Sequence, residues 1–172
     1  MKELDLTSLQ IFKITFIIKN MLVNERIDYI TNWIGEYSKS NSKIPFNLVI
    51  GVSGGIDSAV TSALCARTNI KTIAVSMPIK QNKDQHSLSL EHIDWLKSKF
   101  KNIESYIIDL NNLFNSFENV MSKFDSKLAY ANSRSRLRMT TLYHVAQSNN
   151  ALVVGTGNKI EDFGIGFYTK YG

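Results

Sequence analysis

Apolar residues recur at spacings of three and four in several segments of the chain and form short continuous runs in others. The first pattern predicts amphipathic helices over residues 22–38, 84–100 and 131–147. Shorter helices are predicted over residues 57–67 and 112–123. The predicted buried faces of the three long helices comprise Ile27, Ile30, Ile34 and Tyr37; Leu88, Trp95, Leu96 and Phe100; and Met139, Leu142, Tyr143 and Ala146.

The short apolar runs are rich in β-branched residues and predict buried strands over residues 47–52, 71–76, 103–108 and 151–155. These strands alternate with the predicted helices. The alternation predicts an α/β fold, a doubly wound parallel sheet with helices on both faces. Because ligands of such sheets bind beyond the carboxyl ends of the strands, the segments after Val52 and Val154 are the places to search for a site.

A Ser/Gly-rich loop, Ser53–Ser58, joins the first predicted strand to the next helix. Its glycines would let phosphate oxygens approach the backbone, while loop N–H groups and the helix dipole would attract them. Ser53 and Ser58 could donate hydroxyl hydrogen bonds, and Asp57 could bind a Mg²⁺ ion that the phosphates also hold. The structural alternative is a turn in which Asp57 or Ser58 caps the helix.

Two other phosphate motifs are absent from the sequence. It contains no Gly-x-x-x-x-Gly-Lys-Ser/Thr segment, and no Gly-x-Gly-x-x-Gly segment follows the first strand. These absences argue against a kinase or GTPase loop and against a dinucleotide-binding fingerprint. A loop that holds a leaving pyrophosphate fits the pattern better.

The net charge of +5 on 172 residues is mild, and it fits either a nucleic-acid surface or a pocket for small anions. The lysines are scattered, whereas Arg134, Arg136 and Arg138 form one compact cluster. On a helix Arg134 and Arg138 share a face and could be solvated. Arg136 points nearly opposite and borders the apolar side, which makes it the better candidate for a buried anionic ligand.

The single cysteine, Cys65, excludes an intramolecular disulfide and fits a reducing cytosol. Its place inside the predicted helix 57–67 favours a packed cysteine. Near the N-terminus, residues 9–18 are apolar but too short to span a bilayer, and no signal-peptide cleavage site follows. Residues 1–20 are therefore either an extension or a native helix that packs on the domain formed by residues 21–172.

The loop Ser53–Ser58 resembles that of the ATP pyrophosphatase superfamily, whose members cleave ATP between the α and β phosphates. The later segments Gly155–Lys159, Glu161–Asp162 and Gly166–Gly172 look like bacterial NAD synthetase, and Asn132–Met139 resembles the Arg-x-Arg-Met helix of that family. The resemblance runs from about Ile27 to the last residue, and its motifs follow the order of the family.

The resemblance implies a Rossmann-like ATP pyrophosphatase fold and a set of site residues. Asp57 and Glu161 match the acidic Mg²⁺ ligands, with Asp162 as the alternative to Glu161 because the spacing to Lys170 is one residue longer than in some members. Arg136 and Lys170 match residues that bind deamido-NAD. The positions that match ATP-binding residues are Gly51, Val52, Ser53, Gly54, Gly55, Ile56, Asp57, Ser58 and Thr156.

The activity that the resemblance implies is the ATP-dependent amidation of deamido-NAD with ammonia, by a cytoplasmic homodimer and with no catalytic base or nucleophile assigned. A separate glutaminase could supply the ammonia, and neither a nucleic-acid nor a membrane partner is expected. The family continues beyond Gly172 with an Asp-Gly-Gly stretch and a helical region, so the chain is expected to be truncated and, alone, poorly soluble or weakly active. The alternatives are an inactive nucleotide-binding remnant and a tRNA-thiolating enzyme.

Overall fold

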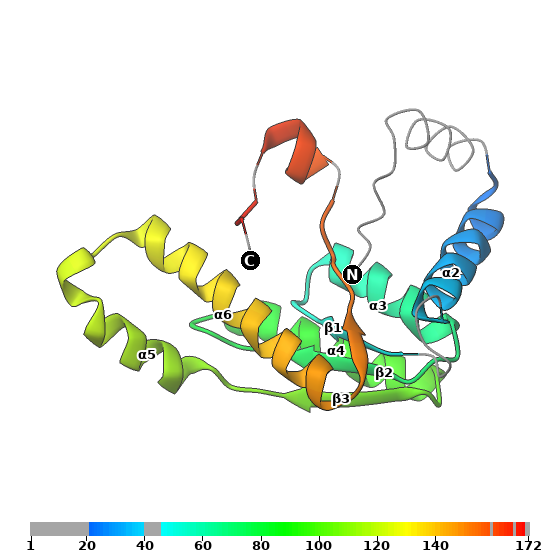
Figure 1. Cartoon of the computed structure of the whole chain (residues 1–172), viewed down its shortest axis with the longest axis horizontal. Helices are drawn as coiled ribbons and strands as arrows, with labels where there is room; N and C mark the ends of the chain where they lie inside the picture. Colours follow the sequence, from blue (N-terminus) through cyan, green and yellow to red (C-terminus); the bar gives the residue numbers. More distant parts are fainter. Residues whose placement is uncertain (1–20, 40–45, 159, 167, 171–172) are drawn as a thin grey trace.

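The computed structural model describes residues 21–39, 46–158, 160–166 and 168–170, and the prediction for residues 1–20 lies outside these ranges. Figure 1 shows the elements in chain order. The helices are α2 (Val23–Lys39), α3 (Ile56–Arg67), α4 (Lys83–Lys99), α5 (Asn111–Val120), the 3₁₀ turn η1 (Ser122–Phe124), α6 (Lys127–Ser148) and the π-helical turn η2 (Ile160–Ile165). The strands are β1 (Asn47–Gly51), β2 (Thr72–Ser76), β3 (Ile103–Ile107) and β4 (Ala151–Val153).

The four strands form one parallel sheet in the order β3-β2-β1-β4, as the alternation of elements predicted. Val49 of β1 lies opposite Ile73 of β2 on one side and Val153 of β4 on the other. The chain therefore builds the sheet in one direction from β1 to β3 and then returns to the other side of β1. This reversal leaves the carboxyl ends of β1 and β4 side by side.

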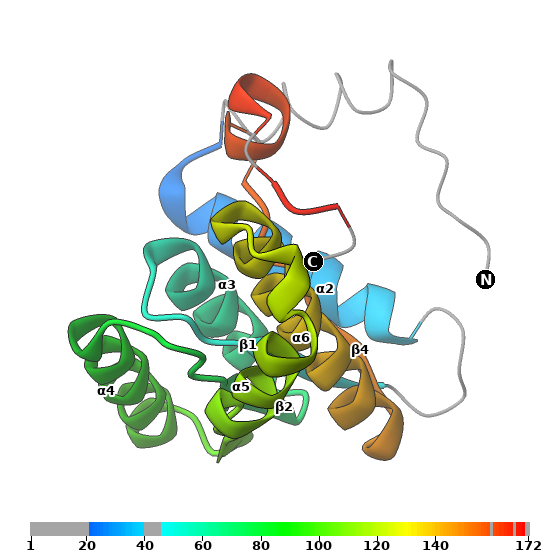
Figure 2. The same cartoon turned by 90° about the vertical axis from the view of Figure 1, so that its left-hand side faces the viewer.

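Helices cover both faces of the sheet, so the doubly wound arrangement is confirmed. On one face Val49 and Val75 pack in the same core cluster as Phe114 of α5 and Ala146 of α6. Figure 2 shows the helices that cover this face separated from α3 and α4. The core of the second face is formed by Leu48 and Ile50 with Ile34 of α2 and Cys65 of α3, and by Val52 and Ala74 with Ile93 of α4.

The predicted buried faces of the helices are partly wrong. On α4 it is Ser89, Ile93 and Leu96 that are buried, whereas Leu88 and Trp95 are 51% and 44% exposed. The phase differs because Ser89 packs against the sheet, where its hydroxyl hydrogen-bonds to the Val52 carbonyl at 2.8 Å. A polar residue on the buried side cannot be recognised from apolar spacing alone. Two further residues predicted to be buried are exposed: Tyr37, 42% exposed, and Tyr143, 59% exposed.

Two helix boundaries also differ from the prediction. Helix α6 begins at Lys127, because the side chain of Ser126 accepts a hydrogen bond from Ala129 N–H at 3.3 Å and caps the helix. Helix α5 ends at Val120, and the predicted remainder up to residue 123 enters the 3₁₀ turn η1. Both changes concern the hairpin between α5 and α6, away from the carboxyl ends of the strands.

Cys65 is fully buried in α3, and burial raises the pKa of its thiol to about 12. The interpretation of Cys65 as a packed helical residue is confirmed, because a thiol with that pKa is not a nucleophile near neutral pH. No helix among the described residues is long and apolar enough to cross a membrane.

Candidate functional site

A pocket of about 1030 Å³ opens at the carboxyl ends of β1 and β4. The loop after β1 and the segment after β4 both contribute to its wall, as expected for the point at which strand order reverses. Of the residues assigned to ATP, those that line the pocket are Gly51, Val52, Ser53, Gly55 and Thr156. Gly54, Ile56, Asp57 and Ser58 are not among the lining residues, and Ile56 is exposed.

The two glycines of the loop have different roles. Gly54 adopts a positive φ of 88°, and a Cβ atom there would lie 2.2 Å from the carbonyl oxygen of Gln85 in α4. The close approach of α4 therefore requires a glycine at position 54, independently of the approach of phosphate that the sequence suggested. A Cβ atom on Gly55 would meet only Ser53 Oγ, at 3.4 Å, so Gly55 leaves open backbone at the pocket.

Hydrogen bonds within the loop fix its shape. The buried Ser58 hydroxyl donates to the Gly55 carbonyl at 2.9 Å and accepts from Ser53 N–H at 3.2 Å. Gln81, from the segment after β2, donates to the Ser53 carbonyl at 2.9 Å. The Ser58 hydroxyl is thus committed to the loop, and of the two serines expected to donate to phosphate only Ser53 is exposed.

Helix α3 points its N-terminus at the loop. Its N-cap residue is Gly55, and no side chain caps the helix. The alternative in which Asp57 or Ser58 caps α3 is therefore wrong. The N–H groups of an uncapped first turn and the positive end of the helix dipole attract an anion.

Asn158 connects the segments that carry the acidic residues. The Asn158 side-chain amide donates to Asp57 Oδ2 at 3.4 Å, and its oxygen accepts from Ile160 N–H at 2.9 Å and from Glu161 N–H at 3.4 Å. Asn158 therefore ties the first turn of α3 to the first turn of η2. Glu161 is exposed, whereas the Asp162 carboxylate folds back so closely that a Cβ atom on Gly157 would lie 2.5 Å from Asp162 Oδ2.

Within the described ranges no three His, Cys, Asp or Glu residues form a group that could hold a metal ion. Mg²⁺, however, needs only one or two protein carboxylates when substrate phosphates and waters supply its other oxygen ligands. Asp57, with either Glu161 or Asp162, supplies carboxylate oxygens of the kind that such a site uses.

Arg136 and Lys170 are brought together by the C-terminal segment. Arg136 Nε donates to the Lys170 carbonyl at 3.2 Å, and the Thr169 hydroxyl donates to Asn132 Oδ1 at 2.8 Å. These two hydrogen bonds attach residues 168–170 to α6. Arg136 borders the apolar side of α6, as expected, since it lines a separate apolar pocket of about 340 Å³. It was also the candidate for a buried anionic ligand, but its side chain is exposed.

The large pocket contains Arg134 and Arg138, the two arginines that the helix pattern allowed to be solvated. Arg138 Nε donates to the Met77 carbonyl at the end of β2, at 3.0 Å. Burial lowers the pKa of Arg138, and the nearby charge of Arg134 lowers it further. The spacing of four residues shows that the two side chains share a face, but not that this face is turned to the strand ends.

The comparisons with known proteins identify the family of this chain. The sequence profile of the NAD synthase family matches residues 26–172. The chain belongs to this family. The fold class and the resemblance inferred from the loop and from the C-terminal motifs are thereby confirmed.

Two curated relatives are NH₃-dependent NAD⁺ synthetases. The protein from Mesoplasma florum is 40% identical over 158 residues, which are 88% of this chain and 61% of the relative. The protein from Carboxydothermus hydrogenoformans is 34% identical, over 86% of this chain and 60% of the relative. The chain thus spans well under two thirds of these relatives.

Two solved structures of the family share the fold. An NH₃-dependent NAD synthetase from Campylobacter jejuni superposes with a TM-score of 0.76 at 31% identity, over 88% of this chain and 63% of that one. An NMN synthetase from Francisella tularensis superposes with a TM-score of 0.78 at 34% identity, over 89% of this chain and 61% of that one. The family therefore includes proteins named for two different nicotinamide nucleotide products.

Proposed function

We propose that this chain supplies the ATP-activating part of an NAD synthase, which converts deamido-NAD and ammonia to NAD while ATP is cleaved to AMP and pyrophosphate. The observation that carries the proposal is the loop after β1, fixed by its own hydrogen bonds and backed by the uncapped N-terminus of α3. The loop lies where the strand order reverses, and it lines the same pocket as Thr156, which follows β4. A nucleotide could bind in this pocket, between the carboxyl ends of β1 and β4.

The reaction needs activation because the nicotinate carboxylate has a poor leaving group. A carboxylate oxygen attacks the α-phosphorus of ATP. The bond between the α-phosphorus and the oxygen that bridges it to the β-phosphorus breaks, and pyrophosphate leaves. Ammonia then attacks the carbonyl carbon of the acyl-adenylate, AMP departs and the surplus proton passes to solvent. The chain's contribution is the positioning of two polyanions and the stabilisation of charge on the departing pyrophosphate.

The residues divide this work between them. Loop N–H groups, the Ser53 hydroxyl and the first turn of α3 bind the pyrophosphate portion of ATP, and Thr156 contacts ATP from the β4 side. Asp57 and Glu161 would hold Mg²⁺, which would offset the negative charge of the phosphates. Arg136 and Lys170, which meet on α6, bind deamido-NAD.

The test is a parallel assay of NAD and AMP formation from deamido-NAD, ammonia and Mg-ATP. We expect both products in equal amounts, and a loss of about 100-fold in kcat/KM for Asp57→Asn, because one metal ligand is removed. Asp28→Asn is the matched control. It neutralises an exposed carboxylate that pairs with Arg67 at the C-terminal end of α3, away from the loop, and it should leave both rates unchanged.

Each contrary outcome of this assay would assign a different function to the chain. Mg-ATP binding without either product would indicate a nucleotide-binding remnant, the alternative that the short span of the chain raises. AMP formation with nicotinic acid mononucleotide, and not with deamido-NAD, would assign the reaction of an NMN synthetase, the name of the Francisella tularensis neighbour. Stimulation of AMP formation by tRNA would favour the tRNA-thiolating alternative.

We further propose that the chain acts in the cytoplasm as a homodimer, with ammonia free in solution or supplied by a separate glutaminase. Exposed apolar side chains at the turn between α5 and α6, namely Val120, Phe124 and Leu128, support an association through this end of the molecule. Light scattering after gel filtration measures the mass. A mass of one chain at all concentrations would contradict the dimer.

A further inference from the structure

The large pocket has an unusual charge pattern. Lys80, Arg134 and Arg138 line it, and none of its described lining residues is Asp or Glu. Lys80 forms an ion pair with Glu118 of α5. Neither Arg134 nor Arg138 takes part in any of the ion pairs found among the described residues. The pocket thus presents two guanidinium groups without an acidic partner.

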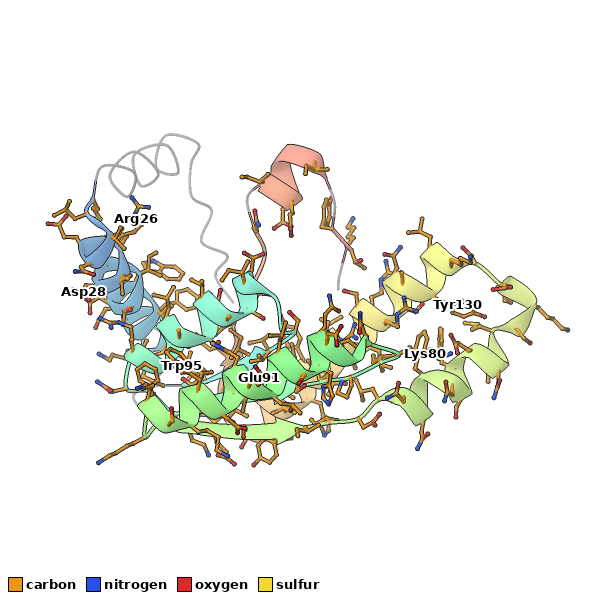
Figure 3. All side chains as sticks on the ribbon, turned by 180° about the vertical axis from the view of Figure 1, so that it is seen from behind. Arg26, Asp28, Lys80, Glu91, Trp95 and Tyr130 are labelled. Carbon is orange, nitrogen blue, oxygen red and sulfur yellow. The ribbon has the colours of Figure 1, made fainter. Side chains whose placement is uncertain are left out.

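Both arginines are held in place by neutral groups. Arg138 Nε donates to the Met77 carbonyl at 3.0 Å, which leaves its terminal nitrogens available. The guanidinium carbon of Arg134 lies 5.6 Å from the centroid of the Phe114 ring, within the range of a cation–π contact. Phe114 is itself fully buried and packs edge-on against Tyr130 at 6.2 Å. Figure 3 shows Tyr130 between α6 and α5, and Lys80 where the segment after β2 reaches them.

This arrangement is electrostatically unfavourable in the absence of a ligand. The two arginines are one helical turn apart on α6, both partly buried, and like charges at that spacing destabilise each other. The lowered pKa of Arg138, caused first by burial and then by the charge of Arg134, has the same origin. A polyanion in the pocket would offset both charges and make charge-assisted hydrogen bonds to them.

We propose that Arg134 is an additional phosphate-binding residue, whose guanidinium, steadied by Phe114, binds the diphosphate group of a nucleotide across the pocket from the loop Ser53–Ser58. The assignment rests on the proposed function, which places a nucleotide diphosphate in this pocket. Arg134 lies in the segment that resembles the family's helix but precedes the Arg-x-Arg-Met motif itself, Arg136–Met139, and the resemblance gives it no role. Both ATP and the dinucleotide carry a diphosphate, and the experiment separates them.

Isothermal titration of the full chain with Mg-ATP, magnesium pyrophosphate and deamido-NAD tests the assignment. We expect Arg134→Gln to raise the Kd of at least one of these ligands about tenfold, and Arg134→Lys to raise it less, because Lys keeps the charge but loses the planar fork. The ligand whose Kd changes identifies the diphosphate that Arg134 binds. Arg67→Gln, at an exposed arginine at the end of α3, removes the same charge and should change each Kd less than twofold.

The outcomes separate the two proposals. If the unmodified chain binds the ligands and Arg134→Gln binds all three within twofold of it, the role of Arg134 is refuted and the proposed function stands. If the unmodified chain binds none of them, the proposed function fails and the role of Arg134 fails with it. A urea titration of each variant checks folding, and Arg134→Lys decides the question if Arg134→Gln unfolds.

Discussion

Two walls of the candidate site are built in different ways. The loop wall, residues 51–58, continues from β1, whose three central residues are buried, and its shape is fixed by the buried Ser58 hydroxyl and by the approach of α4 to Gly54. The segment called here the C-terminal wall, the described residues between 160 and 170, carries Glu161 and Lys170, lines neither pocket and is mostly exposed. It is tied to the rest of the site through Asn158 and through two hydrogen bonds to α6.

The two walls therefore differ in what fixes the positions of their residues. The loop wall takes its geometry from the packing that stabilises the whole fold, so a change there acts on folding and on the site together. The C-terminal wall depends on individual polar contacts, each of which contributes only about 1 kcal/mol. Substitutions in the C-terminal wall should therefore alter the site while leaving the stability of the fold intact.

The largest effect is expected for Gly54→Ala. The new methyl group would meet the Gln85 carbonyl at 2.2 Å on a backbone with φ of 88°, so strain and displacement of α4 should lower the free energy of unfolding by about 3 kcal/mol. The midpoint of urea denaturation, followed by circular dichroism, measures the change.

Gly55→Ala is the control for that experiment. Its methyl group meets only Ser53 Oγ at 3.4 Å, and the φ of Gly55 is −89°, which alanine adopts readily. We expect stability within about 1 kcal/mol of the unmodified chain and weaker binding of pyrophosphate. Equal destabilisation by both substitutions would show that the packing of α4 does not distinguish the two glycines.

A smaller and local effect is expected for Thr169→Val. The substitution removes the hydrogen bond to Asn132 and should favour local opening of the C-terminal wall by about 1 kcal/mol. Amide hydrogen exchange, read by mass spectrometry, should accelerate around residues 160–170 while the urea midpoint stays unchanged. Thr140→Val is the control, because Thr140 hydrogen-bonds only to the Arg136 carbonyl of its own helix. A lower global midpoint would place Thr169 in the fold-determining core.

The smallest expected effect is that of pH on stability, through a contact between α3 and α4. His92 of α4 hydrogen-bonds to the buried Ser62 of α3 at 2.8 Å, and burial lowers the pKa of its imidazole. The unfolded chain therefore binds a proton more readily, and stability should fall as pH drops through the usual histidine pKa of about 6.5. His92→Gln should flatten this part of the stability profile between pH 7 and 5. An unchanged slope would show that His92 does not cause it.

The sequence predicted the strands well, because short β-branched runs between helices leave few alternatives and a parallel sheet follows from the alternation. It predicted helix faces less well. The phase of α4 depends on Ser89, whose hydroxyl bonds to the Val52 carbonyl, and nothing in the local pattern indicates that partner. Apolar spacing locates a helix, but contacts with segments distant in sequence decide which of its faces is buried.

The same limit affected the site. The strand–loop–helix motif predicted the loop, because its residues are close in sequence and follow a strand end. The neighbourhood of Arg136 and Lys170 came instead from the resemblance, which matches both to residues that bind deamido-NAD. The sequence did not reveal that Arg134 and Arg138 enter the large pocket, since the rotation of α6 about its axis is set by packing against β1 and β4. It also did not reveal that the backbone of α4 requires a glycine at position 54, because Gln85 is distant in sequence.

The strand order has a further consequence for the way the chain folds. Strand β1 pairs with β4, about a hundred residues later in the chain, as well as with β2, which follows after one helix. Pairings between distant segments form slowly, because closing the intervening loop costs entropy before any contact offsets it. The crevice between β1 and β4 can exist only after this last pairing. Nucleotide binding should thus develop with the slowest refolding phase, and it would serve as a reporter of completed topology during synthesis.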